Sequence, residues 1–96
     1  MSTSVIAVFK AKDEMFEKLK ETFKGVLTET KNYDGCQQLG ACSDENAKSV
    51  ILYEVWDSVD QHKKYLKWRE DTGALKTIDE MCREVPVISY KSFLFQ

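Results

Sequence analysis

Apolar residues in this chain gather in four short runs, and segments with helical spacing separate them. The runs cover residues 4–10, 36–42, 48–56 and 87–95, and the second is the least apolar. Residues 50–56 are dominated by β-branched and aromatic side chains, which suit a buried strand. The pattern therefore predicts four strands, with 48–56 in the centre of the sheet.

Two helical regions lie between these strands. The first has an apolar face with spacings of three and four, and we expect Asp13 to cap its start. Ser58 and Gln61 have the spacing of a capping box, so a second helix is expected to begin there. Residues 71–73 interrupt that helix, and helical spacing then resumes until Pro86 stops it. The apolar face of the first helix comprises Met15, Phe16, Leu19, Phe23, Val26 and Leu27.

The order of these elements, β-α-β-β-α(α)-β, identifies a fold class. Two strand–helix–strand units that enclose a hairpin make the ferredoxin-like plan, an α+β fold with helices on one face of a four-stranded antiparallel sheet. The chain of 96 residues is short enough to form one domain, 1–96.

The face of the sheet away from the helices also has an apolar pattern. In the central strand Val50 and Leu52 have one parity and Ile51 and Val55 have the other, so neither face alternates with polar residues. An exposed apolar face of this kind is unusual in a monomer. We therefore predict a homodimer that joins two sheets about a two-fold axis, with residues 90–95 contributing to the contact.

Composition and charge narrow the classes of partner and location. The 14 basic and 16 acidic residues give a net charge of −2 and alternate along the helices, which argues against nucleic acid as a partner. No apolar run has the length of a membrane span, and the first residues do not form a secretory signal. Cys36, Cys42 and Cys82 lack zinc-ligand spacing, so we interpret them as reduced, buried thiols of a cytoplasmic protein.

The junction between the central strand and the second helix has the most chemically versatile side chains. The strand ends with Tyr53, Glu54 and Trp56, and the helix has His62, Tyr65 and Arg69 on one stripe because residues three and four apart share a face. We place the candidate site there.

Three motifs, one before the second strand and two at this junction, resemble the antibiotic biosynthesis monooxygenase family. They are YDGC at 33–36, YEVWDS at 53–58 and HKKY at 62–65; the extension WREDTG at 68–73 is similar to a subset of the family. The resemblance implies a dimeric α+β barrel. It also implies that some relatives oxygenate polycyclic phenols or quinols with dioxygen and without a metal, flavin or haem, whereas others degrade haem or modify small signalling molecules.

Several positions depart from the family pattern. Many members have a His where this chain has Tyr65. The haem-degrading branch has an Asn near the end of the first strand, where this chain reads FKA at 9–11, and it has a haem-ligating His that is missing here because His62 is the only His. These departures disfavour haem degradation, and no cofactor or metal is expected.

Cofactor-free oxygenation needs a base, donors for an anion and a water-poor cavity. His62 is the expected base, with Tyr65 as a donor and Arg69 as the group that holds the anion. The substrate-binding residues are expected to be Tyr53, Glu54, Trp56 and Trp68.

Each of these residues also has a structural interpretation. Arg69 would then pair with a carboxylate such as Glu54, and the aromatic residues would belong to the core or the dimer interface. Glu54 is expected to be paired or to have a raised pKa. Two other functions remain open: a binding or stress-response barrel without catalysis, and an isomerase or degrading enzyme for a small carbonyl compound.

Overall fold

The computed structural model describes residues 2–96 and contains four strands and three α-helices. Their order confirms the predicted β-α-β-β-α(α)-β succession. The elements are β1 Thr3–Lys10, the one-turn 3₁₀ helix η1 Asp13–Met15, α1 Phe16–Lys31, β2 Cys36–Asp44, β3 Ser49–Trp56, α2 Val59–Asp71, α3 Ala74–Glu80 and β4 Val87–Lys91.

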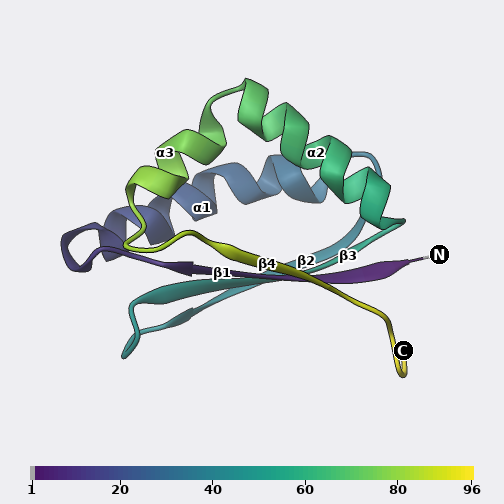
Figure 1. Ribbon diagram of the computed structural model, residues 1–96, viewed down its shortest axis with the longest axis horizontal. Helices are drawn as coiled ribbons and strands as arrows, with labels where there is room; N and C mark the ends of the chain where they lie inside the picture. Colours follow the sequence, from purple (N-terminus) through teal and green to yellow (C-terminus); the bar gives the residue numbers. More distant parts are fainter. Residues whose placement is uncertain (1) are drawn as a thin grey trace.

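The four strands form one antiparallel sheet in the order β2-β3-β1-β4. Figure 1 shows that all three helices lie over one face of this sheet, and that no element within residues 2–96 covers the other face. This arrangement confirms the α+β, ferredoxin-like fold. Strands β1 and β3 occupy the centre, as predicted for residues 48–56.

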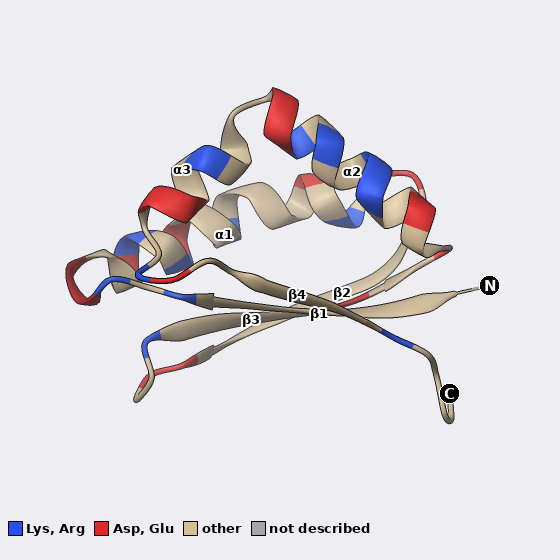
Figure 2. Cartoon of the chain, in the orientation of Figure 1, with Lys and Arg blue, Asp and Glu red and all other residues tan. Residues whose placement is uncertain are grey.

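The two faces of the sheet differ in burial. On β3, Val50, Leu52, Glu54 and Trp56 face the helices and are buried, whereas Ile51, Tyr53 and Val55 on the other side are half-buried or exposed. We call this second surface the open face. It is formed by Ser4, Ile6 and Val8 of β1, Ile51, Tyr53 and Val55 of β3, Gln38, Gly40 and Cys42 of β2, and Val87, Ser89 and Lys91 of β4. Figure 2 shows few charges on the strands, while the helices carry both signs.

The core between sheet and helices divides into two clusters. In the larger one, side chains from β1, β3, α1 and α3 pack together, with the rings of Phe9 and Phe23 4.8 Å apart. The smaller cluster centres on Val5, Trp56 and Tyr65, where α2 crosses the sheet. The candidate site lies beside this smaller cluster.

The two predicted helix starts have different outcomes. Ser58 Oγ accepts a hydrogen bond from the Gln61 backbone N–H at 3.1 Å, which confirms the predicted cap of α2. The prediction that Asp13 caps the first helix is wrong. An extra 3₁₀ turn precedes α1, and Asp13 lies inside that turn, where its carboxylate is 3.8 Å from Lys48 Nζ.

The last strand is shorter than predicted, because β4 ends at Lys91 rather than at residue 95. Lys91 pairs with Ser4, close to the beginning of β1, so residues further along the chain meet no partner strand. The tail bends away from the helices (Figure 1), and Leu94 and Phe95 are 102% and 93% exposed.

The three cysteines are free thiols, but the prediction that all are buried is wrong. Only Cys82 is buried. Cys42 is exposed because it lies on the edge strand β2, opposite Ile51 on the open face.

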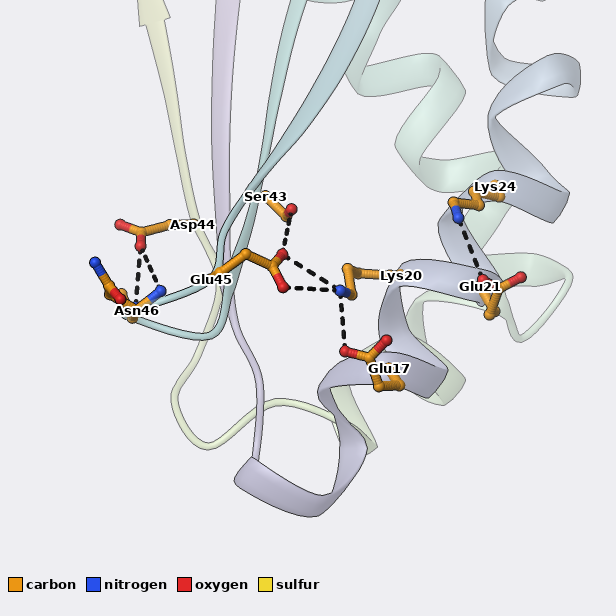
Figure 3. A network of polar contacts seen from close by, with 9 residues as sticks. Glu17, Lys20, Glu21, Lys24, Ser43, Asp44, Glu45 and Asn46 are labelled. Atoms are coloured by element: carbon orange, nitrogen blue, oxygen red, sulfur yellow. Dashed lines mark hydrogen bonds and ion pairs between the residues drawn. The ribbon is translucent and has the colours of Figure 1, made fainter.

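The turn between β2 and β3 is held by polar contacts at the protein surface (Figure 3). The Asp44 carboxylate accepts hydrogen bonds from the backbone N–H groups of Asn46 and Ala47. Lys20 of α1 pairs with Glu17 and with Glu45 of the turn, so it connects the helix to the hairpin. These ion pairs are largely exposed and contribute little to stability.

Gly35, between α1 and β2, has a φ of +94°, a conformation that other residues adopt only with strain. A Cβ at this position would also collide with the Gln61 side chain. We expect Gly35→Ala to lower the free energy of unfolding by about 1–3 kcal/mol. Gly25→Ala is the matched control: Gly25 is inside α1 with free space around it, so this change should raise the free energy by about 1 kcal/mol. Urea denaturation of both variants measures whether the two changes in the free energy of unfolding have these opposite signs.

Candidate active site

The buried face of α2 consists of His62, Tyr65 and Arg69. Their spacing of three and four places them on one stripe, and this stripe points toward the end of β3, where Glu54 and Trp56 face the helices. The helix therefore brings polar groups over the end of β3, where the sheet itself contributes the buried Glu54.

A small cavity lies between this stripe, the sheet and the other two helices. Its volume is about 40 Å³, which is enough for a few water molecules or dioxygen. Glu54, His62, Tyr65 and Arg69 supply its polar groups. The rest of the wall is mainly apolar and includes Phe9, Phe23, Leu52, Leu75, Ile78 and Ile88.

Glu54 is 4% exposed, a rare degree of burial for a carboxylate. Its Oε1 atom accepts a hydrogen bond of 2.6 Å from Trp56 Nε1. Burial raises the pKa of Glu54 above its ordinary value, and the hydrogen bond from Trp56 partly opposes that rise by stabilising the anion. The raised pKa was one of the two alternatives predicted for this residue.

His62 is 2% exposed, and burial lowers its pKa to about 4. Its Nδ1 atom lies 2.8 Å from the Tyr90 hydroxyl, and its Nε2 atom lies 3.7 Å from Glu54 Oε1. The second distance is too long for a hydrogen bond. Because the lowered pKa keeps the imidazole neutral at neutral pH, the proximity of His62 to Glu54 is not an ion pair.

Arg69 joins α2 to α1 through a buried network. Its guanidinium donates hydrogen bonds to the Tyr65 hydroxyl at 2.9 Å, the Val26 carbonyl at 2.8 Å and Thr30 Oγ1 at 3.0 Å. A contact of 3.4 Å to Glu29 Oε1 completes the set. The carboxylate that pairs with Arg69 is therefore Glu29 and not Glu54, whose Oε1 accepts the hydrogen bond from Trp56.

A cluster of aromatic side chains packs against residues that line the cavity. Trp56 is fully buried, with its ring centroid 5.0 Å from that of Tyr65. Trp68 packs against Tyr33 at 5.2 Å and against the Arg69 guanidinium at 4.6 Å. Neither tryptophan lines the cavity. Tyr53, which is 52% exposed, lies on the open face over Gly40 and does not reach the cavity.

The model of one protein family, antibiotic biosynthesis monooxygenase, matches residues 2–70, which is most of the chain. The chain belongs to this family. The match covers β1 to α2, and so includes Glu54, Trp56, His62, Tyr65 and Arg69.

Solved structures show the same fold at low sequence identity. A conserved protein from Methanosarcina mazei Go1 is 18% identical, with a TM-score of 0.83 over 96% of this chain and 94% of its own. Rv0793 from Mycobacterium tuberculosis is 17% identical, with a TM-score of 0.83 over 100% and 98%. A protein described as antibiotic biosynthesis monooxygenase is 14% identical, with a TM-score of 0.85 over 96% and 98%. No curated protein is similar enough in sequence to count as a match.

Two residues beside the site were not predicted to lie there: Tyr90 was expected at the dimer contact with residues 90–95, and Thr30 was not singled out. Tyr90 pairs with Val5 across the sheet, so it faces the helices and reaches His62. Counting parity along the last strand would have placed it there. Thr30, whose hydroxyl lies 2.6 Å from that of Tyr65, gave no signal because a Thr near a helix end is ordinary.

The lowered pKa of His62 makes stability depend on pH. In the unfolded chain an imidazole binds a proton near pH 6.5, whereas in the folded protein this requires a pH of about 4. The unfolded state therefore gains protons first as the pH falls, and the free energy of unfolding should drop across this window by up to about 3 kcal/mol. Denaturation of the wild type and of His62→Gln at several pH values isolates this loss. An identical slope in both proteins would contradict it.

Proposed function

We propose that this protein is a cofactor-independent monooxygenase that acts on an aromatic or quinol-like small molecule in the cavity under α2. The observation that carries the proposal is the buried pair of Glu54 and His62 at the polar end of an apolar cavity. A water-poor site with two proton-handling groups suits removal of a phenolic proton.

The electrons for the reaction are available from such a substrate. Oxidation of a phenolic ring carbon that bears hydrogen to a quinone carbonyl by dioxygen yields one water molecule, so atoms and electrons balance without an external reductant. The protein has to take the phenolic proton, stabilise the anion and exclude water. Its apolar walls, with aromatic groups from β1 and α1, suit a flat ring.

The size of the cavity sets a condition on this function. A volume of about 40 Å³ accepts dioxygen but not an aromatic ring. Leu66 of α2 and Leu75 of α3 are half-buried residues of the wall. We infer that the ring enters when these side chains move outward, which separates α2 and α3 from the sheet locally.

A homodimer through the open face is the proposed assembly. Ile6, Val8, Ile51 and Val55 form a half-buried apolar surface there, and the exposed Leu94 and Phe95 extend from its edge. Burial of this surface against its symmetric copy removes an apolar patch from water.

The expected ligand is a small molecule, and charge supports this. Positive and negative side chains are interspersed on the helices (Figure 2), which does not provide the basic surface that nucleic acid requires.

Within residues 2–96 no helix is long and apolar enough to cross a membrane. We infer a cytoplasmic location, where reduced thiols are the rule, from the three free cysteines.

One observation favours the alternative of ligand binding without catalysis. Arg69 and Tyr65 already form hydrogen bonds with each other, with Thr30 and with the Val26 carbonyl. Their polar groups are therefore used to join two helices. An isomerase would use the same Glu54 and His62 without dioxygen.

Oxygen uptake by the purified protein against a panel of quinols and phenolic polycycles separates these functions. The proposal expects uptake above autoxidation with no added cofactor, and no product under nitrogen. Product formed equally without dioxygen would establish the isomerase. Saturable binding without any turnover would leave a binding protein.

A further inference from the structure

Glu54 and His62, the two groups that can exchange protons at the cavity, each have one side-chain atom in a hydrogen bond and one without a partner. Glu54 Oε1 is occupied by Trp56, and His62 Nδ1 is occupied by Tyr90. Glu54 Oε2 and His62 Nε2 have no hydrogen-bond partner among residues 2–96. Both residues line the cavity.

The neighbours of His62 determine which nitrogen has the proton. Nε2 lies 3.7 Å from a carboxylate oxygen, so a lone pair there would face negative charge, whereas an N–H is attracted. Nδ1 lies 2.8 Å from a phenolic hydroxyl that can donate. Burial, and then the charge of Glu54, raise the pKa of Tyr90, so this hydroxyl keeps its proton at neutral pH. Both neighbours favour the tautomer with the proton on Nε2.

We propose that Tyr90 is a positioning residue that fixes His62 as an Nε2–H donor, which leaves Glu54 as the base of the site. The phenolic O–H bond of the substrate breaks as an O–H bond forms at Glu54 Oε2. The phenolate oxygen then accepts a hydrogen bond from His62 Nε2–H. This assignment rests on the proposed function and reverses the expectation that His62 is the base.

The other groups around the cavity agree with this division. Arg69 and Tyr65 of α2 are engaged with each other and with α1, and α1, α3 and β1 contribute only apolar side chains to the wall. The Cys36 thiol of β2 has its pKa raised to about 11 by burial and by the charge of Glu54, so it is neutral. Within the cavity Glu54 is therefore the group able to accept a proton at neutral pH. Tyr90 lies beyond the region that the family model matches.

The tautomer can be measured directly because His62 is the only histidine. In protein labelled with ¹⁵N at histidine, NMR at neutral pH should show a protonated Nε2 and an unprotonated Nδ1. Tyr90→Phe removes one oxygen atom and should shift population to the Nδ1–H form. Tyr33→Phe is the matched control in the same aromatic cluster, because the Tyr33 hydroxyl forms no hydrogen bond with His62, and it should keep the wild-type spectrum. A wild-type Nδ1–H form, a charged ring, or no change in Tyr90→Phe would overturn the assignment.

Turnover gives a second readout. In the active enzyme kcat/KM should fall on acidification with an apparent pKa that His62→Gln leaves in place, because the amide still donates a hydrogen bond. Loss of that acid limb in His62→Gln would return the role of base to His62. If no substrate is turned over, the proposed function fails while the tautomer result still stands or falls by the NMR spectrum.

Discussion

Replacing Arg69 by methionine is expected to lower the free energy of unfolding by about 3–5 kcal/mol. Arg69 is 5% exposed, and its guanidinium donates to the Tyr65 hydroxyl, the Val26 carbonyl and Thr30 Oγ1. Methionine has a similar length and no donors, so it removes these three buried hydrogen bonds, while the hydroxyls of Thr30 and Tyr65 still bond to each other. Urea denaturation followed by circular dichroism measures the loss.

Two other variants separate the contribution of the hydrogen-bond network to the free energy of unfolding from the contribution of the charge. Arg69→Lys keeps the charge but not the planar set of donors, so it should lose a large part of the same free energy. Glu29→Gln should cost less than about 1 kcal/mol, because the Glu29 side chain is 62% exposed. If Arg69→Met were as stable as the wild type, the network would not be what joins α2 to α1.

If the chain forms the proposed homodimer, replacing Val8 by lysine is expected to convert it to a folded monomer, with an increase of at least about 100-fold in the dissociation constant. Val8 lies on the open face between Ile51 and Val87. In an isolated chain the lysine amine reaches water, so the fold tolerates it. In the proposed dimer two such charges would be brought together across the two-fold axis and removed from water.

Sedimentation velocity of wild type, Val8→Lys and Val85→Lys tests this prediction. Val85 is 86% exposed and precedes β4, away from the paired strands, so lysine there should leave the dimer intact. A monomeric wild-type protein at micromolar concentration would contradict the proposed assembly, as would a Val8→Lys variant that remains dimeric.

Local patterns in the sequence were sufficient for the fold because each element shows its own signal. Ser58 and Gln61 mark the start of α2 through a cap that the structure contains, and the strand runs follow in an order that few topologies accommodate. The predictions fail where the structure of a segment depends on a neighbouring element. Residues 92–95 are as apolar as a strand requires, so the sequence predicted that the last strand continues through them. The strand ends at Lys91 instead, because β1 has no further residues to pair with it.

The sequence placed the candidate site at the junction of β3 and α2, and the structure brings Glu54, His62, Tyr65 and Arg69 together around a cavity there, whereas Tyr53, Trp56 and Trp68 do not line it. Side chains alternate along a strand, so Tyr53 cannot share a face with Glu54 and Trp56, and it lies on the open face instead. That distinction was available from the sequence. The partners of Arg69 were not, because Val26 and Thr30 are on a helix about forty residues away, and only packing brings them together.

The most direct test of the proposed site is oxygen uptake by Glu54→Gln with the best substrate of the panel. Glutamine keeps the shape and the hydrogen bond from Trp56 but cannot take a proton, so the rate should fall at least about 100-fold. Glu80→Gln, an exposed position on α3, should behave as the wild type. Uptake in Glu54→Gln equal to that of the wild type would show that the chemistry does not occur in this cavity.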